Sequence, residues 1–284
     1  MADAIIWFLQ QLSELYVNTT FDITLVISST AGGLISEMYN YAIRVAEVSK
    51  AVAYSVLALF FLLELHKVSL RADGAGSGSS LSVEIVFRVL IKMVLCKMAV
   101  DSAPLILRSI YDLSVYLSGI IVTEHGAGVD AVPFDPAALL NLDTIREELN
   151  KLNFFMSFLI LIMSIFTFLP MSAATLIGGA ILFARLLEFF VYLAISPIPI
   201  ATLGHEEMSQ IGKNFLKSVA AVCLQGTLII LVLTFFPLML KIAFVTTGTD
   251  NTLGVLLGVQ LYSIALVMGV LGAGKWAKQI CNAM

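Results

Sequence analysis

The chain has 284 residues, of which 59% are hydrophobic and only 13% are charged, and its formal net charge is -4. A mean hydropathy of +0.97 is too high for a water-soluble core of this size, so the composition indicates a membrane protein. A sequence pI near 5.4 argues against a dedicated nucleic-acid-binding domain, which would carry a basic face.

Residues 1–47 are predicted to form an amphipathic N-terminal region. Apolar residues, among them Ile5, Phe8 and Leu12, recur there at helical spacing with polar residues between them. The segment carries Asp3 where a secretory signal would have basic residues, so it is not interpreted as a signal peptide. Two placements of this helix remain open, on the membrane surface or packed against the other helices.

Five transmembrane helices are predicted, near residues 48–65, 152–172, 176–203, 218–240 and 253–273. No charged side chain lies between Lys151 and Arg185, and a straight helix over this run would be roughly 50 Å long, against a hydrocarbon core of roughly 30 Å. The run is therefore predicted to break, at Pro170 or at Gly178 and Gly179. The predicted fold is an all-α, polytopic membrane helical bundle with additional amphipathic interfacial helices.

The first predicted transmembrane helix, 48–65, is followed by a long segment, 66–151, that combines a linker, amphipathic helices and an acidic loop. Asp73–Ser80 is rich in Gly and Ser, which is typical of a flexible, solvated linker. The helix that follows it carries Arg88 and Lys92 on one side. These cations can lie among anionic headgroups at the interface, or they can form an ordinary solvated face.

The distribution of Lys and Arg predicts an N-terminus outside and a C-terminus inside, because cytoplasmic flanks keep positive charge. With residues 66–151 in the cytoplasm, twelve basic residues lie inside and three outside. An alternative topology sends residues 102–122 across the membrane. Its cost is Arg108 and Asp112 within the bilayer, which is reduced because the two lie four residues apart on a helix and can pair.

Three ionisable side chains within or near the predicted spans are candidate assembly or passage residues. Placing a charge at the centre of a membrane helix costs about 2.5 to 3.5 kcal/mol. Arg185 and Glu188 share a helix face and can pair, either as an internal salt bridge or at a subunit contact or hydrated passage. Glu64 lies near the end of its span and can instead snorkel to the interface.

Residues 194–204 interrupt the helical pattern. Two prolines spaced by one residue cannot sit within a regular helix, so we expect an extended segment. Such backbone is tolerated in a bilayer only where protein or water covers it, so the segment is a loop at the membrane surface or a broken helix that faces a cavity. The residues assigned to this broken helix are Ser196, Pro197, Pro199 and Gly204.

An amphipathic helix is predicted to restart over residues 206–217, before the next span. It carries Lys213 and Lys217 on one side, which adds two cations to the predicted interfacial basic face of Arg88 and Lys92.

No catalytic, cofactor-binding or metal site is predicted. Cys96, Cys223 and Cys281 are far apart and odd in number, so they indicate buried thiols rather than a disulfide framework or a zinc site. No histidine belongs to an H-E-x-x-H motif, and no set of nucleophile, base and orienting group can be assembled. A membrane-embedded enzyme is therefore disfavoured.

Three blocks of sequence resemble a known family: Ile195-Ser-Pro-Ile-Pro-Ile-Ala-Thr-Leu-Gly-His-Glu-Glu, Ile211-Gly-Lys-Asn-Phe-Leu-Lys-Ser and Leu224-Gln-Gly-Thr-Leu-Ile-Ile. In these blocks, and in its layout after Ala42, the chain resembles the TrbL-like polytopic channel subunits of conjugative type IV secretion systems. It is most similar to those carried on conjugative elements of Gram-positive bacteria. Residues 122–141 show no such likeness.

The resemblance implies a non-enzymatic subunit of a bacterial cytoplasmic membrane, needing no cofactor, that helps single-stranded DNA with its attached relaxase to cross. It implies a homo-oligomeric ring among membrane lipids, with a pentamer as one stoichiometry, and a secretion ATPase, a coupling protein and a bitopic assembly subunit as partners. The alternative is a secondary transporter or channel for a small solute or ion. Transporters usually have two similar halves, and the first half has no counterpart to residues 196–199.

Overall fold

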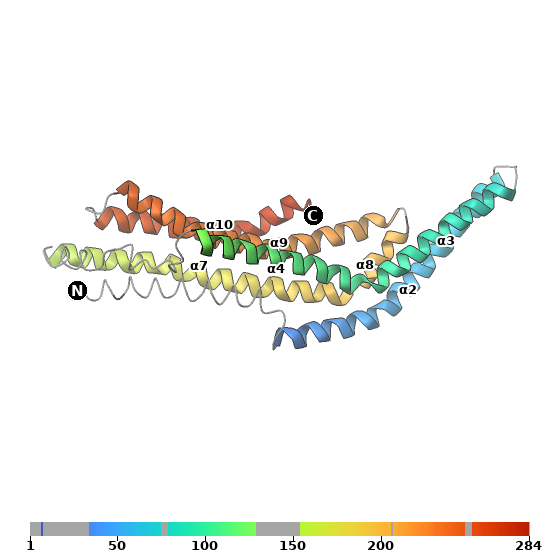
Figure 1. Ribbon diagram of the computed structural model, residues 1–284, viewed down its shortest axis with the longest axis horizontal. Coiled ribbons are helices and arrows are strands. Elements are labelled where there is room, and N and C mark those ends of the chain that lie inside the picture. Colours follow the sequence, from blue (N-terminus) through green and yellow to red (C-terminus); the bar gives the residue numbers. More distant parts are fainter. Residues whose placement is uncertain are drawn as a thin grey trace. The chain divides into compact units, whose positions relative to one another are not determined.

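The described part of the chain is built from helices. The computed structural model describes residue 7 and residues 34–74, 79–128, 154–205, 207–247 and 252–283. Its α-helices are α2 (Leu34–Gly74), α3 (Ser79–Asp101), α4 (Ala103–Gly128), α7 (Phe154–Ile195), α8 (Pro197–Ala201), α9 (Ser209–Thr247) and α10 (Thr252–Ile280), and Thr202–Gly204 forms the 3-10 helix η1 (Figure 1). These ranges contain no strand, and the all-α prediction is confirmed.

Four segments of the described residues are long and apolar enough to cross a membrane: Ser36–Leu70, Ala103–Ile121, Leu176–Ile195 and Ser209–Phe235. Large apolar side chains point outward from them, and Val48 and Leu176 are 73% and 74% exposed. Water would disfavour so much exposed apolar surface, whereas lipid accommodates it. The predicted polytopic membrane bundle is confirmed.

Three of these four segments overlap predicted spans. The other, Ala103–Ile121, is the additional span that the alternative topology requires. The guanidinium Nε of Arg108 lies 3.6 Å from Oδ2 of Asp112, so the two charges within this segment pair as expected. The predicted spans near 152–172 and 253–273 fall in α7 and α10, where many side chains lie outside the described set, and they stay predictions.

Helix α7 runs without interruption from Phe154 to Ile195, so the predicted break at Pro170 or at Gly178 and Gly179 is wrong. The helix has 42 residues and is about 63 Å long at 1.5 Å per residue. It exceeds the thickness of the hydrocarbon core about twofold. The excess length requires the helix to extend past the core, but it does not require the helix to bend or end inside it.

The segment after α7 is helical, so the prediction of an extended conformation is wrong. The short helix α8 starts at Pro197 and has prolines at its first and third positions. The first N–H groups of any helix have no acceptor within it, so prolines at these positions remove no helical hydrogen bond from α8. The 3-10 helix η1 follows, and His205 ends it with extended backbone angles, φ -109° and ψ 132°. The two prolines thus end one helix and begin another.

Helix boundaries also differ from the predicted domain limits. Helix α2 runs through the predicted boundary between residues 47 and 48, and only residues 75–78 separate it from α3. Of the predicted N-terminal amphipathic helix, only Trp7 is described, and it is helical. The rest of that helix, and the predicted acidic loop within 129–153, lie outside the described residues.

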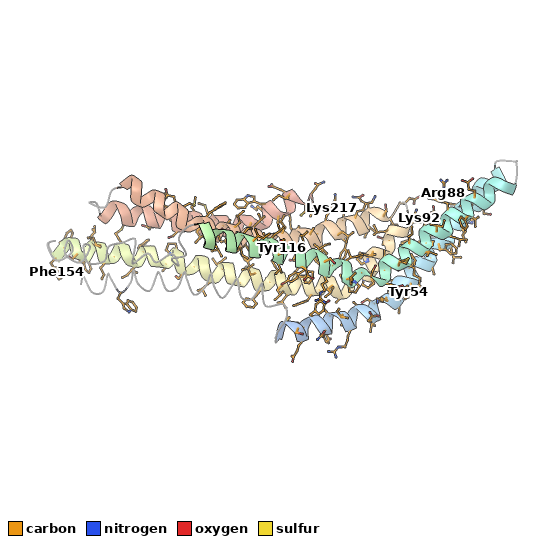
Figure 2. The ribbon with its side chains drawn as sticks, in the orientation of Figure 1. Tyr54, Arg88, Lys92, Tyr116, Phe154 and Lys217 are labelled. Atoms are coloured by element: carbon orange, nitrogen blue, oxygen red, sulfur yellow. The ribbon has the colours of Figure 1, made fainter. Side chains whose placement is uncertain are left out.

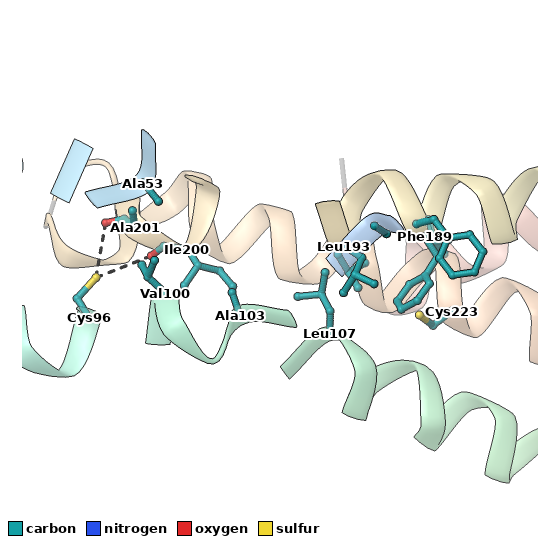
Figure 3. Close-up of a cluster of buried hydrophobic side chains, with 14 of the residues drawn as sticks. Ala53, Cys96, Val100, Ala103, Leu107, Phe189, Leu193, Ile200, Ala201 and Cys223 are labelled. Atoms are coloured by element: carbon teal, nitrogen blue, oxygen red, sulfur yellow. Dashed lines mark hydrogen bonds between the residues drawn. The ribbon is translucent and has the colours of Figure 1, made fainter. Parts of the chain in front are cut away.

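The chain divides into two compact units, each with its own core. We call residues 30–113, 186–224 and 277–284 the turn unit. Within it, α2 and α3 lie side by side and antiparallel, and α8 packs against both (Figure 1). Small and branched side chains of these helices and of the parts of α4, α7 and α9 in this unit fill one buried cluster, which includes Ala53, Leu57, Cys96, Val100, Leu107, Leu193, Ile200 and Val219 (Figure 3).

The bundle unit consists of residues 1–29, 114–185 and 225–276. Hydroxyl groups join its helices: Oγ of Ser114 on α4 lies 2.9 Å from Oγ1 of Thr227 on α9, and the buried Ser118 hydroxyl donates to Thr227 at 3.1 Å. At Gly269 an added Cβ would lie 2.9 Å from Cγ1 of Val232, so α10 packs closely on α9 there. Small residues and hydroxyl contacts are typical of helix packing in lipid.

Candidate functional site

The proline turn, residues 196–205, compensates for the hydrogen bonds that its prolines remove. Pro197 has no N–H, so the carbonyl oxygen of Leu193 loses its usual helical donor. The Ser196 hydroxyl donates to this oxygen at 2.9 Å, and the Ser196 amide lies 3.4 Å from it. The Thr202 hydroxyl donates to the carbonyl oxygen three residues before it, at 2.7 Å. Two hydroxyl side chains therefore stabilise the backbone of the turn.

Helices α2 and α3 supply further donors to this backbone. The Ser49 hydroxyl of α2 lies 2.9 Å from the carbonyl oxygen of Ala194, at the end of α7. From α3, the Cys96 thiol donates to the carbonyl oxygens of Ala201, at 3.6 Å, and Ile200, at 3.9 Å (Figure 3). Because α2 bonds the last turn of α7 and α3 bonds the proline turn itself, this irregular backbone is covered by protein, as a membrane protein requires.

Two glycines allow this close approach. At Gly204 an added Cβ would lie 3.1 Å from Sγ of Cys96 and 3.3 Å from a methyl group of Leu57. At Gly212, in the first turns of α9, it would lie 2.8 Å from the carbonyl oxygen of Pro199. A backbone atom cannot rotate away as a side chain can, so the second position has no room for a larger residue.

Two charged contacts join α2 to the end of the turn. Oε2 of Glu64 lies 3.8 Å from Nε2 of His205, both side chains are largely buried, and the Phe60 ring lies against the imidazole with centroids 5.2 Å apart. Nζ of Lys67 lies 2.5 Å from Oε1 of Glu207, and this pair is exposed. The Lys67 ammonium holds the pKa of Glu207 below its ordinary value, because it donates a hydrogen bond to the carboxylate. Glu64 therefore faces His205 at the end of the turn, and its position relative to the membrane surface stays a prediction.

Arg185 and Glu188 lie three residues apart on α7, and both are half-buried. Oε1 of Glu188 accepts a hydrogen bond from the Tyr192 hydroxyl at 3.0 Å. The Tyr192 ring in turn packs edge-on against Phe215 of α9, with centroids 5.7 Å apart. Glu188 is thus connected to the packing of the turn unit, while its pairing with Arg185 stays a prediction.

The predicted basic face is divided between two helices. Arg88 and Lys92 lie on α3, where Arg88 pairs with Glu84 at 3.5 Å, and Lys213 and Lys217 lie on α9 (Figure 2). Because α3 packs antiparallel along α2, the axes of the two helices lie along the same line. Arg88 and Lys92 can therefore lie among the headgroups only if the part of the α2–α3 hairpin that carries them lies at the depth of the headgroups. Their interfacial position stays a prediction.

Sequence reasoning gave no role to Ser49, Cys96, His205 or Gly212. Cys96 is buried, as expected of an inert thiol, yet it also donates to the turn. Gly212 follows Gly204 by eight residues, and this second glycine after the two prolines is a signal that could have marked the close packing of α9. Among the residues that the structure describes, no group of three or more His, Cys, Asp or Glu side chains could hold a metal ion.

Comparison with known proteins gives the chain its family. Neither a curated protein nor a solved structure matches it. The family described as TrbL/VirB6 plasmid conjugal transfer protein matches residues 77–273, which is more than half of the chain and includes α4, α7, the proline turn and α9. The chain therefore belongs to the TrbL/VirB6 plasmid conjugal transfer family and is a membrane subunit of a conjugal, type IV secretion apparatus.

Proposed function

We propose that this chain is a non-enzymatic channel and scaffold subunit that helps single-stranded DNA, with its attached relaxase, to cross the cytoplasmic membrane. Membership of the conjugal transfer family supports the setting. The observation that carries the proposal is the proline turn, which contacts α2 through Glu64, accepts a hydrogen bond from Cys96 of α3 and packs closely on α9. Such a turn fixes the directions of several membrane helices, as a scaffold requires.

The long helices suit a subunit that works among partners. Helix α7, with 42 residues, and α9, with 39 residues, extend well past a hydrocarbon core that about 20 residues span. Their ends offer surfaces to the secretion ATPase, the coupling protein, the bitopic assembly subunit and further copies of the chain in a ring. The net charge of -4 suits a wall that DNA passes without tight binding.

We further propose five membrane crossings, by α2, α4, α7, α9 and α10. An uninterrupted α7 supports one crossing where two were predicted, and Ala103–Ile121 supports a crossing by α4. The N-terminus stays outside and the C-terminus inside. The α2–α3 hairpin and the proline turn then face the cytoplasm with Lys67, Lys92 and Lys213, which agrees with the distribution of positive charge.

The proposal is tested by crosslinking the transferred DNA to the subunit in mating cells. After formaldehyde treatment the subunit is immunoprecipitated, and the transferred strand is amplified by polymerase chain reaction. We expect recovery of the transferred strand above that of an unlinked chromosomal locus, and loss of the signal when the donor carries an inactive relaxase. A subunit that supports transfer but never recovers the strand would overturn the channel role, and solute uptake that follows its expression without a relaxase would support the transporter.

A further inference from the structure

Helix α3 has two apolar faces. One is packed against the rest of the protein, and its residues Val89, Cys96 and Val100 are at most 7% exposed. The opposite face is also apolar but points outward. Its side chains, which are 47% to 62% exposed, are Phe87, Ile91, Val94, Leu95 and Met98. With 3.6 residues per turn, these five positions form one stripe along about three turns of the helix. A helix that needs one packed face carries polar residues on the other, so the outer stripe indicates a further contact.

Positive charges border the outer stripe on both sides. Arg88 and Lys92 follow one edge of it, and Lys97 lies beyond the other edge. No acidic residue lies along the stripe, and the Glu84 that pairs with Arg88 precedes it. An apolar stripe between cations is typical of a helix in the membrane interface, because its apolar side chains lie among acyl chains while Lys and Arg reach the headgroups.

The charges of α3 also oppose a crossing of the membrane. Among the described residues, the segments long and apolar enough to cross do not include α3. Its charged residues are distributed over the helix and are Glu84, Arg88, Lys92, Lys97 and Asp101. Charged side chains inside the hydrocarbon core are costly, whereas the interface accommodates them. The outer stripe can therefore meet lipid best if α3 lies along the membrane surface.

The chain changes direction where α3 meets α4. Pro104, the second residue of α4, has no N–H for the carbonyl oxygen of Val100, and its ring crowds that carbonyl, which bends a helix. The Ser102 hydroxyl donates to the carbonyl oxygen of Met98 at 2.6 Å and satisfies backbone at the bend. Figure 1 shows α3 inclined to the first turns of α4, with α2 bending beside them. The α2–α3 hairpin therefore leaves the direction of α4, which is apolar enough to cross.

We propose that the outer stripe of α3 lies among acyl chains at the membrane surface, with Lys92 and Lys97 at the phosphates of anionic phospholipids. Helix α3 then runs along the membrane plane before α4 enters the bilayer. Helix α2 allows this arrangement, because its 41 residues are about 62 Å long, twice the roughly 30 Å of the hydrocarbon core. This inference concerns attachment of the subunit to lipid and does not rest on the transfer of DNA.

The occupant of the stripe is identified by photo-crosslinking. Full-length protein with p-benzoylphenylalanine in place of Phe87 is irradiated in its native membranes, and the adducts are identified by mass spectrometry. The same group at Phe183, which is 56% exposed in a candidate span, is the positive control, and at Phe189, which is 3% exposed, the negative control. We expect phospholipid adducts at Phe87 as at Phe183, and none at Phe189. Adducts to a second copy of the chain or to another protein in place of lipid would overturn the proposal.

The depth of two positions tests whether α3 lies along the surface. Phe87 and Met98 are 11 residues apart, as their numbers show, which is about 16 Å along the helix axis. Phe87→Trp and Met98→Trp are reconstituted in full-length protein with lipids brominated near the glycerol or near the end of the acyl chain. After subtraction of the wild-type signal from Trp7 and Trp276, we expect both introduced indoles to be quenched about twofold more by the shallow bromines. Opposite preferences at the two positions would show an upright helix and overturn the proposal.

The role of the cations is tested in bilayers of equal parts phosphatidylglycerol and phosphatidylcholine. We expect photo-adducts at Phe87 to favour phosphatidylglycerol about fivefold or more. Lys92→Gln with Lys97→Gln should return this ratio close to unity, whereas Lys278→Gln, which removes an exposed cation of α10, should preserve it. An even ratio in the wild type, or an equal loss in Lys278→Gln, would overturn the binding of anionic headgroups by Lys92 and Lys97.

Discussion

Prolines interrupt two apolar stretches of this chain, and the helix responds differently in each. At Pro170 helix α7 continues, although the proline lies well inside it. At Pro197 and Pro199 the helix ends, a short helix begins and the chain turns toward α9. The second site has a second proline, a Ser196 hydroxyl that bonds the carbonyl freed by Pro197, a Thr202 hydroxyl that bonds another carbonyl of the turn, and donors from two neighbouring helices.

The difference shows that a proline does not end a membrane helix by itself. A single missing donor costs one hydrogen bond, and the apolar surroundings penalise any further unpaired backbone, so the helix persists. A break becomes stable when other groups satisfy the backbone that it frees. The proline turn is therefore a feature of the whole turn unit, and its removal should affect α2, α3 and α9 together.

The largest effect is expected when the prolines of each site are replaced by alanine and the two variants are compared in conjugative transfer. Pro197→Ala with Pro199→Ala should let α7 continue, because alanine favours the helix, and conjugative transfer should fall sharply while membrane insertion stays normal. Pro170→Ala should favour α7 by up to about 3 kcal/mol and leave transfer unchanged. Transfer frequency and membrane levels are measured for both. Wild-type transfer by the double variant would show that the turn is only a connector.

The next effect concerns the charges on α7 between the two proline sites. If Arg185 and Glu188 compensate each other, Glu188→Leu leaves a buried cation without its partner, at a cost of about 3 to 5 kcal/mol. The double change with Arg185→Leu should recover much of the lost membrane level. Additive losses in the two single variants and the double variant would show that the charges act separately.

A smaller effect should separate close packing from helix propensity. Gly212→Ala places a methyl group 2.8 Å from the carbonyl oxygen of Pro199, and we expect it to lower the thermal stability of the detergent-solubilised protein by about 1 to 3 kcal/mol. Gly179→Ala is the matched control, because an added Cβ meets no atom within 4 Å there. It should be neutral or stabilising by up to about 1 kcal/mol. Equal behaviour of the two variants would contradict the packing of α9 on the turn.

The hydroxyl groups of the turn should each contribute less. Ser196→Ala removes the donor to the carbonyl oxygen of Leu193 and should cost about 1 kcal/mol in the same unfolding measurement. Ser172→Ala, near Pro170, removes a hydroxyl that donates to its own helix at 3.0 Å and should cost less. A Ser196→Ala variant as stable as the wild type would show that the turn does not depend on this hydroxyl.

The last prediction places the two proline sites relative to the membrane without disturbing either. Single cysteines introduced at Ser77 and Ser209 should resist a membrane-impermeant thiol reagent in intact cells, whereas a cysteine at Val129 should react, because α4 has then crossed outward. Reaction at Ser77 or Ser209 would contradict the proposed orientation. If the cysteine at Val129 does not react with the reagent, residues 66–151 lie in the cytoplasm and α4 does not cross the membrane.

The sequence was sufficient for the fold class and for most of the membrane helices, because apolar runs and charged flanks carry that information locally. It also marked the proline turn, since two prolines spaced by one residue are a strong local signal. It failed on the conformation of the turn, because the groups that bond this part of the backbone include the hydroxyl of Ser49 and the thiol of Cys96, which lie on other helices.

The same limit applies to the contacts of the site. Glu64 and His205 are 141 residues apart in the sequence, as their numbers show, and neither has a partner at helical spacing that would predict their meeting. The role of Gly212 is likewise invisible until α9 is seen against Pro199. In both cases the signal lies in tertiary packing, which composition and periodicity do not encode.

The hydroxyl contact between α4 and α9 also sets an order of events during synthesis. Ser114 and Thr227 are 113 residues apart, so at roughly 5 to 20 residues per second α4 leaves the ribosome about 6 to 23 seconds before its partner. In that interval the Ser118 hydroxyl can donate to the carbonyl oxygen of Ser114 in its own helix, at 2.9 Å. Helix α4 can therefore insert into the bilayer before α9 is synthesised. Its hydroxyl contact with Thr227 forms only after α9 has left the ribosome.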